Sequence, residues 1–272
     1  YRQRVIQMGE DPSKVFNTGA PGIDNIVNLD LLSKDDLEKQ LAWKFPKECA
    51  LFTYHPVTLE NDDLKRDLSI ILDILTHSGI GILFTYANAD NGGRVINKKI
   101  EAFCKLDPDK YKVVKSLGQL RYLSAMKYVD LLIGNTSSGI IEAASFQKPV
   151  INIGNRQLGR LQSGNVIDST IENLEESINK VTSIFFIEHC NDVVNIYGDG
   201  NASCHIVAFL EGQNLSPVKK FNDSKNPVEF NVSTVSLKSF EIVQNYLFFM
   251  SFDMMDAFEY FKENGIFNTV IA

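Results

Sequence analysis

Short apolar runs alternate along this chain with segments of helical periodicity. Such runs, bounded by turn residues, are typical of strands that are buried on both faces of a parallel sheet. We expect strands at residues 49–54, 80–86, 111–114, 131–133, 149–153 and 165–168, and a further short strand at 15–18. Residues 19–25 contain Gly and Pro directly after that short strand, so they are expected to form a tight turn.

Between these runs, apolar residues recur at the three- and four-residue spacing of an amphipathic helix. The clearest case is residues 61–77, where one stripe holds Leu64, Leu68, Ile71, Leu72 and Leu75. Other helices are expected at residues 33–43, 95–104, 119–128, 140–146, 171–186 and 202–210, and the end of a helix at residues 1–10. Strands and helices that alternate over short connections predict an α/β fold with a doubly wound parallel sheet.

The character of the sequence changes near residue 221. Residues 222–227 read as a linker, and the remainder is rich in Phe and Met, with helical pattern in places. We therefore expect one Rossmann-like domain over residues 1–221, followed by a linker and helical tail over residues 222–272. The start without Met, in the middle of a predicted helix, suggests a fragment that lacks a preceding domain.

Composition excludes several classes of function. The net charge of −7 and the isoelectric point near 5.2 argue against nucleic-acid binding through a basic surface. No apolar run approaches the roughly 20 residues of a membrane span. The four cysteines show no CxxC spacing and fit reduced thiols, so we expect a cytoplasmic protein. His189-Cys190 and Cys204-His205 offer adjacent ligands, which is poor zinc geometry, and no metal site is expected.

Residues 131–160 carry the most informative pattern, LLIGNTSSGIIEAASFQKPVINIGNRQLGR. A strand, a turn of Gly and hydroxyl residues, and a helix follow one another, and the free N–H groups of a helix start favour an anion such as a diphosphate. Glu142 lies one turn into that helix, where it could accept sugar hydroxyls. Arg156 follows the next strand and could neutralise phosphate charge. A capped helix and a surface arginine would give the same pattern.

Two further polar residues follow strands. His55 comes after the strand at 49–54, and Asn88 comes after the strand at 80–86. The carboxyl ends of parallel strands face the cleft in which open α/β sheets bind ligands. The Asn88 amide could read the edge of a uracil or ribose, although an ordinary polar turn explains it equally well.

Together, GNTSSGIIEA and KPVINIGNRQLGR resemble the UDP-N-acetylglucosamine 2-epimerase family, most closely its hydrolysing branch. The segments HPVT, VFNTGAPGIDNI and YGDGNAS also resemble that family. The resemblance implies one half of a two-domain, GT-B-type enzyme, namely the half that binds UDP. The expected ligand is UDP-N-acetylglucosamine or a related UDP-sugar, held in the cleft between the two Rossmann-like domains.

Position by position, the resemblance implies a catalytic role for His55 and UDP-sugar contacts for Asn88, Leu117, Thr136, Ser137, Glu142 and Arg156. Leu117 would hold the base through its backbone. Thr136 and Ser137 would meet the diphosphate, and Glu142 would bind the ribose. The family usually has Ser where Thr136 stands, and either side chain supplies a hydroxyl.

The implied reaction removes the proton at sugar C2 while UDP leaves from C1, and water then adds to the glycal. The products are N-acetylmannosamine and UDP, for sialic or nonulosonic acid synthesis. No nicotinamide or metal cofactor is implied. The base for the C2 proton would lie in the other half of the enzyme, so we expect this chain alone to bind UDP without turnover.

Three alternatives stay open on the sequence. One is a non-hydrolysing epimerase, which would return UDP-N-acetylmannosamine. Another is a GT-B glycosyltransferase, although no acceptor motif is evident. The third is a module that binds a UDP-sugar without catalysis. The resemblance also allows a homo-oligomer.

Overall fold

The computed structural model of the chain describes residues 1–56, 64–88, 92–212 and 222. The chain divides into two compact units, one of residues 17–216 and the other of residues 1–16 and 217–272. The expected helical tail lies outside the described residues, apart from Asn222. The expected domain boundary at residue 221 stays a prediction.

The larger unit contains a six-stranded parallel sheet in the order β3-β2-β1-β4-β5-β6. Its strands are β1 (Cys49–Thr53), β2 (Gly81–Thr85), β3 (Tyr111–Val114), β4 (Leu131–Gly134), β5 (Val150–Ile153) and β6 (Val166–Ser169). Central β1 pairs Leu51 with Leu83 of β2 and with Leu132 of β4. The predicted parallel α/β fold and these six strands are confirmed.

Ten α-helices and two 3₁₀-helices are seen in the described part of the chain. They are α1 (Arg2–Gln7), η1 (Pro12–Lys14), α2 (Pro21–Asn28), α3 (Lys34–Leu41), α4 (Leu64–Ser78), α5 (Gly93–Cys104), α6 (Gly118–Tyr128), α7 (Ser137–Ile141), η2 (Ala143–Phe146), α8 (Leu174–Val181), α9 (Ile184–Asn191) and α10 (Ala202–Glu211). Of these, α1 and η1 belong to the smaller unit.

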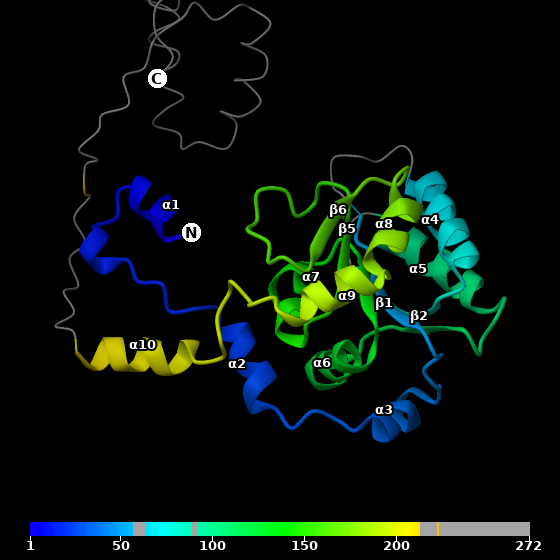
Figure 1. The fold of residues 1–272 in the computed structure, drawn as a ribbon, viewed down its shortest axis with the longest axis horizontal. Helices are drawn as coiled ribbons and strands as arrows, with labels where there is room; N and C mark the ends of the chain where they lie inside the picture. The colour runs from blue at the N-terminus through cyan, green and yellow to red at the C-terminus, as the bar shows by residue number, and fades with distance from the viewer. Residues whose placement is uncertain (57–63, 89–91, 213–221, 223–272) are drawn as a thin grey trace, which may run out of the picture. The chain divides into compact units, whose positions relative to one another are not determined.

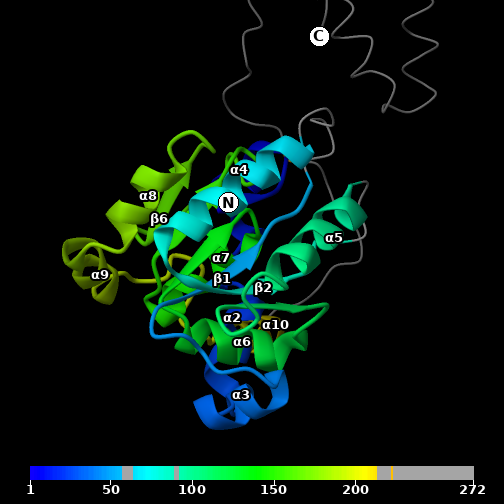
Figure 2. The same ribbon diagram turned by 90° about the vertical axis from the view of Figure 1, so that its right-hand side faces the viewer.

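Helices cover both faces of the sheet, as Figures 1 and 2 show for α4 and α5 against α3 and α6. Because successive side chains of a strand point to opposite faces, each strand supplies two cores. Phe52 and Phe84 pack with α4, α5 and α8, whereas Leu51 and Leu83 pack with α3 and α6. The strands are apolar at nearly every position because neither face meets water.

Three local expectations were wrong. Residues 15–18 form no strand, and the Val15 carbonyl instead accepts a hydrogen bond from the Arg2 side chain. Residues 19–25 are not only a turn, because Pro21 starts α2, where its fixed φ suits a first helical position. The helix expected at 171–186 is divided at Ser183, whose hydroxyl caps the separate helix α9.

The carboxylate of Asp24 explains why α2 is held in place. Its two oxygens accept hydrogen bonds from the backbone N–H groups of Ala202 at 2.9 Å and Ser203 at 2.7 Å. These are unpaired donors of the first turn of α10, so Asp24 caps that helix from 178 residues away in the sequence. The bonds to Ser203 and Ala202 lower the pKa of Asp24 below its ordinary value.

Replacing Phe84 by Ala tests the core on the α4 side of the sheet. The Phe84 ring is fully buried and lies 5.1 Å from that of Phe52 and 5.8 Å from that of Phe103, centroid to centroid. We expect Phe84→Ala to lower the free energy of unfolding by about 3–5 kcal/mol, through lost burial and a cavity. Denaturant unfolding measures the free energy of unfolding of each variant. Phe185→Ala removes a side chain that is 81% exposed and should cost little; equal losses would contradict this packing.

Candidate active site

The strand order places a switch point at the centre of the sheet. The chain continues from β1 to one side, through β2 and β3, and from β4 to the other, through β5 and β6. Open α/β sheets bind ligands in the crevice beyond the carboxyl ends of the two strands at such a point. His55 follows β1, and Asn135 follows β4. These two residues therefore lie at the point where the fold favours a ligand site.

Gly134 lets the ends of these two strands approach closely. Its φ is +138°, and a Cβ built there would lie 1.9 Å from the Thr53 carbonyl oxygen, far inside van der Waals contact. The next residue, Asn135, donates its backbone N–H to the same carbonyl at 3.1 Å. A glycine is required at this position because no side chain fits between the two backbones.

The Asn135 side chain joins the two loops directly. Its Oδ1 accepts the backbone N–H of His55 at 2.7 Å, and its Nδ2 donates to the His55 carbonyl at 2.8 Å. Only 1% of Asn135 is exposed. Both backbone polar groups of His55 are thus bonded to one amide.

The ring of His55 is held from the other side. Its Nδ1 lies 3.1 Å from the backbone nitrogen of Asn88, which follows β2. Since a backbone N–H can only donate, Nδ1 is the acceptor, and the proton of a neutral ring is carried by Nε2. His55 therefore has an N–H donor at Nε2. The backbone N–H of Asn88 thus makes the contact with His55. The predicted contact of the Asn88 side-chain amide with a uracil or ribose stays a prediction.

Arg156 reaches the same point from the loop after β5. Its Nη1 donates to the Asn135 carbonyl at 2.9 Å, and Nε2 of Gln157 donates to that oxygen at 2.8 Å. No carboxylate among the described residues pairs with Arg156. Gln157 is 2% exposed, and its Oε1 has no partner in the described structure. A guanidinium without an ion pair is suited to bind a phosphate.

Thr136 and Ser137 begin α7 next to this group. The Thr136 hydroxyl caps the helix, accepting the Ser138 backbone N–H at 3.4 Å, and the Ser138 hydroxyl is bonded to that of the half-buried Tyr122 at 2.5 Å. Burial raises the pKa of Tyr122, which keeps it neutral. The Ser137 hydroxyl has no hydrogen-bond partner among the described residues. Because α7 has only five residues, its dipole is small, and hydroxyls and Arg156 have to provide most of any anion binding.

Glu142 follows α7 and is half-buried. Burial raises the pKa of its carboxyl group. No donor bonded to this carboxylate is seen in the described part of the chain. The start of α2 lies beside it, since a Cβ on Gly22 would be 3.9 Å from Oε1 of Glu142. The carboxylate can accept hydrogen bonds from hydroxyl groups of a ligand.

Leu117 is placed by different elements from this group. It precedes α6, beyond the end of edge strand β3, and its carbonyl accepts a hydrogen bond from Nε of Arg121 at 2.8 Å. No hydrogen bond among the described residues links Leu117 to His55 or Asn135. The structure thus joins His55 and Arg156 through Asn135, and joins Asn88 to the same group through the His55 ring. Thr136, Ser137 and Glu142 follow Asn135 closely in the sequence.

Sequence reasoning did not assign roles to Asn135, Gln157 and Tyr122. Asn135 stands within the GNTSSG motif and directly after a buried strand, so its place was a usable signal. Gln157 follows Arg156 and gave no signal of its own. Tyr122 lies on α6, and its contact with Ser138 depends on how α6 packs against the sheet.

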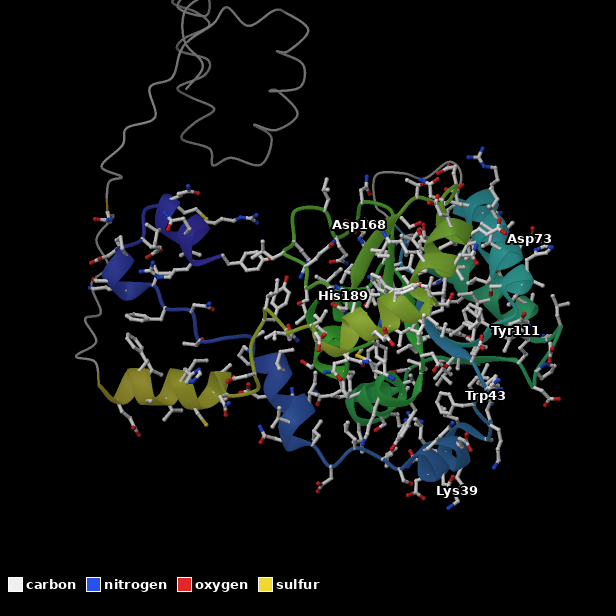
Figure 3. All side chains as sticks on the ribbon, viewed as in Figure 1. Lys39, Trp43, Asp73, Tyr111, Asp168 and His189 are labelled. Atoms are coloured by element: carbon white, nitrogen blue, oxygen red, sulfur yellow. The ribbon has the colours of Figure 1, made fainter. Side chains whose placement is uncertain are left out.

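A large hollow in the described structure lies elsewhere. It measures about 1370 Å³ and is lined by residues that include Lys39, Trp43 and Tyr111, labelled in Figure 3. It lies beside the start of β3 and the end of α5, whereas the residues above follow the ends of strands. Acidic and basic side chains both line it, so charge favours no class of ligand.

The remaining features carry no chemistry of this kind. Within residues that the structure describes, no three His, Cys, Asp or Glu side chains gather so as to hold a metal ion. Burial raises the pKa of Cys190 to about 11, and neighbouring His189 lies 3.2 Å from the Gly164 carbonyl. None of the described helices is long and apolar enough to cross a membrane.

Sequence comparison finds relatives among bacterial proteins. A Campylobacter jejuni protein named GDP/UDP-N,N'-diacetylbacillosamine 2-epimerase (hydrolyzing) is 42% identical over 184 residues, which cover 67% of this chain and 48% of that protein. The polysialic acid biosynthesis protein P7 of Escherichia coli is 34% identical over 230 residues, covering 82% of this chain and 57% of that protein. The chain thus spans about half the length of the relatives it matches.

Solved structures share the fold. A UDP-GlcNAc 2-epimerase from Neisseria meningitidis bound to UDP-GlcNAc has a TM-score of 0.57 at 19% identity, covering 78% of this chain and 58% of that one. A UDP-GlcNAc 2-epimerase from Methanocaldococcus jannaschii has a TM-score of 0.59 at 19% identity, covering 77% and 59%. The family model described as UDP-N-acetylglucosamine 2-epimerase matches residues 1–211, and the chain belongs to that family.

Proposed function

We propose that this chain is the UDP-binding part of a hydrolysing 2-epimerase that acts on UDP-N-acetylglucosamine or a related UDP-sugar. The observation that carries the proposal is the hydrogen-bonded group of His55, Asn88, Asn135 and Arg156 at the switch point of the sheet. This group presents a cation and an N–H donor beside two hydroxyl residues. A diphosphate is the ligand chemistry that such a set would recognise.

The reaction breaks the bond between sugar C1 and the diphosphate oxygen, and the bonding electrons leave with UDP. Arg156 and the Thr136 and Ser137 hydroxyls would stabilise the negative charge that develops there, each well-placed donor being worth a few kcal/mol. His55 would donate through Nε2 to the same phosphate. The C2 proton is lost, and water adds across the resulting glycal. We assign no base for the C2 proton to the described residues.

The nucleoside of UDP would contact Asn88 of this group together with Glu142 and Leu117. Glu142, with its unpaired carboxylate, would accept the ribose hydroxyls, and Asn88 and Leu117 would contact the base. No metal or nicotinamide is assigned to the proposed chemistry.

The choice of the hydrolysing branch is supported by relatives named as hydrolyzing 2-epimerases, in Campylobacter jejuni and Legionella pneumophila. Their names specify diacetylbacillosamine, so a diacetylated UDP-sugar is proposed as a substrate beside UDP-N-acetylglucosamine. The Escherichia coli relative points to sialic acid synthesis. We propose a cytoplasmic location because nucleotide sugars are made there. We also propose that the protein can form a homo-oligomer.

Product analysis tests the proposed function. With UDP-N-acetylglucosamine or its diacetylated counterpart, NMR should detect UDP and a free 2-epimerised sugar when the enzyme is active. A nucleotide-linked product would instead indicate a non-hydrolysing epimerase. For this chain alone, we expect UDP to raise the melting temperature, and no shift would contradict UDP binding. We also expect no turnover by this chain alone, and release of free sugar would contradict that expectation.

Replacing Arg156 by Ala should weaken UDP binding. Loss of a charge-assisted hydrogen bond to phosphate costs about 2 kcal/mol, or roughly 30-fold in Kd. Isothermal titration with UDP measures the change. Lys127→Ala, an exposed cation in the last turn of α6, is the matched control and should bind UDP normally. Equal affinity of Arg156→Ala and wild type would remove Arg156 from the site.

The pH dependence of UDP binding tests Glu142. Because burial raises its pKa above the ordinary value of 4.5, the carboxylate takes up a proton at a higher pH than an exposed glutamate does. Affinity for UDP should therefore fall as the solution is acidified through the raised pKa. Glu142→Gln should bind UDP more weakly at neutral pH and lack this part of the pH dependence, whereas an unchanged pH profile would contradict the role of Glu142.

The same substitution has a predicted effect on stability. A raised pKa means that stability from Glu142 is present below its unfolded pKa and is lost as pH rises through the folded one. At neutral pH, Glu142→Gln should thus be at least as stable as wild type, as judged by urea unfolding. Glu188→Gln, on exposed α9, serves as control. A clearly destabilised Glu142→Gln would indicate a structural partner for the carboxylate.

A further inference from the structure

Asn135 stands between the two groups that the proposed chemistry needs, the His55 ring and the Arg156 guanidinium. Its side chain is bonded to both backbone polar groups of His55, and its backbone carbonyl accepts Arg156. With 1% of its surface exposed, Asn135 does not itself present a surface to a ligand. Its effect on binding would pass through these two neighbours.

An asparagine is well suited to this position. One planar amide supplies both an acceptor and a donor, spaced so as to match the N–H and C=O of a single residue. An ionised Asp would keep the acceptor for the His55 N–H but would place a second acceptor against the His55 carbonyl. An Ala would leave both groups of His55 without these bonds in a region closed to water.

We propose that Asn135 is a positioning residue, which aligns the His55 ring and the Arg156 guanidinium on one bound diphosphate. The inference rests on the proposed function, because the diphosphate is that of UDP. The close contact of β4 with β1 at Gly134 brings the Asn135 amide to His55, and Asn88 then completes the alignment by holding Nδ1 of the ring. Asn135 sets the distance between the donor and the cation.

Asn165 provides a matched control for loss of a buried amide. It is fully buried, and its Nδ2 donates to the Lys148 carbonyl at 2.8 Å. It precedes β6 and so lies at the amino ends of the parallel strands, whereas His55 and Asn135 follow the carboxyl ends of β1 and β4. Asn165→Ala should therefore lower the melting temperature by an amount comparable to that of Asn135→Ala without disturbing His55 or Arg156.

Titration calorimetry with UDP distinguishes positioning from mere stability. We expect Asn135→Ala to raise the Kd for UDP at least 30-fold and Asn165→Ala to change it less than threefold, at a temperature where both variants are folded. A Kd for Asn135→Ala within threefold of wild type, or equal losses for the two variants, would overturn the proposal.

Asn135→Asp adds a readout that a structural role would not produce. Protonation of the introduced carboxyl group restores a donor to the His55 carbonyl, so the ratio of its Kd to that of wild type should fall as pH is lowered from 8 to 5.5. His55, Arg156, Tyr122 and Glu142 are the titratable or charged groups on the elements around it, and the ratio to wild type at each pH removes the contributions that the two proteins share. A ratio that does not depend on pH would contradict the proposed bond to His55.

Nitrogen NMR of the free protein keeps the two proposals separate. The chain has four histidines, and His55→Gln identifies the His55 signals. Wild type and Asn165→Ala should show the tautomer protonated at Nε2, and Asn135→Ala should move toward a mixture of tautomers. If wild type fails to bind UDP, the proposed function fails, and these spectra still decide whether Asn135 aligns His55. Unchanged His55 signals in Asn135→Ala would overturn the positioning role.

Discussion

The site depends on the close approach of two strand ends at Gly134. There the backbone of β4 lies against the Thr53 carbonyl, with no room for a Cβ. This contact allows a single amide, that of Asn135, to bond both polar groups of His55. The parallel sheet provides rigid ends for the loops, and these bonds determine how the loops meet. Precise placement of polar groups needs such support from elements that do not move.

Hydrogen bonds to backbone groups, and not ion pairs, hold the group together. Arg156 is anchored to a backbone carbonyl, and no carboxylate of the described residues neutralises it. An ion pair at this point would have to be broken before a phosphate could bind. Glu142, in turn, has no cation beside it in the described structure, and its burial favours the protonated form. Both side chains remain available to a ligand because neither is paired with the other.

Local pattern predicted the elements well where the tertiary structure agreed with it. Continuous apolar runs located all six strands, because strands buried on both faces need no polar positions. The pattern failed at residues 15–18, where an apolar pair has no neighbouring strand, and at α2, whose place depends on Asp24 capping a helix 178 residues away. Gly and Pro at residues 19–25 predicted a turn, because the local sequence does not show that Asp24 bonds the start of a distant helix.

By itself, the sequence determined the parallel α/β fold, the family resemblance and the types of side chain at the carboxyl ends of the strands. These follow from periodicity and from motifs a few residues long. Only the tertiary structure decided which of those side chains meet. It joined His55 and Arg156 through Asn135 and Asn88 through the His55 ring, and it made Nδ1 of His55 an acceptor. The reason is physical: hydrogen bonds between loops depend on strand order and on close approach of backbones, which a linear pattern does not contain.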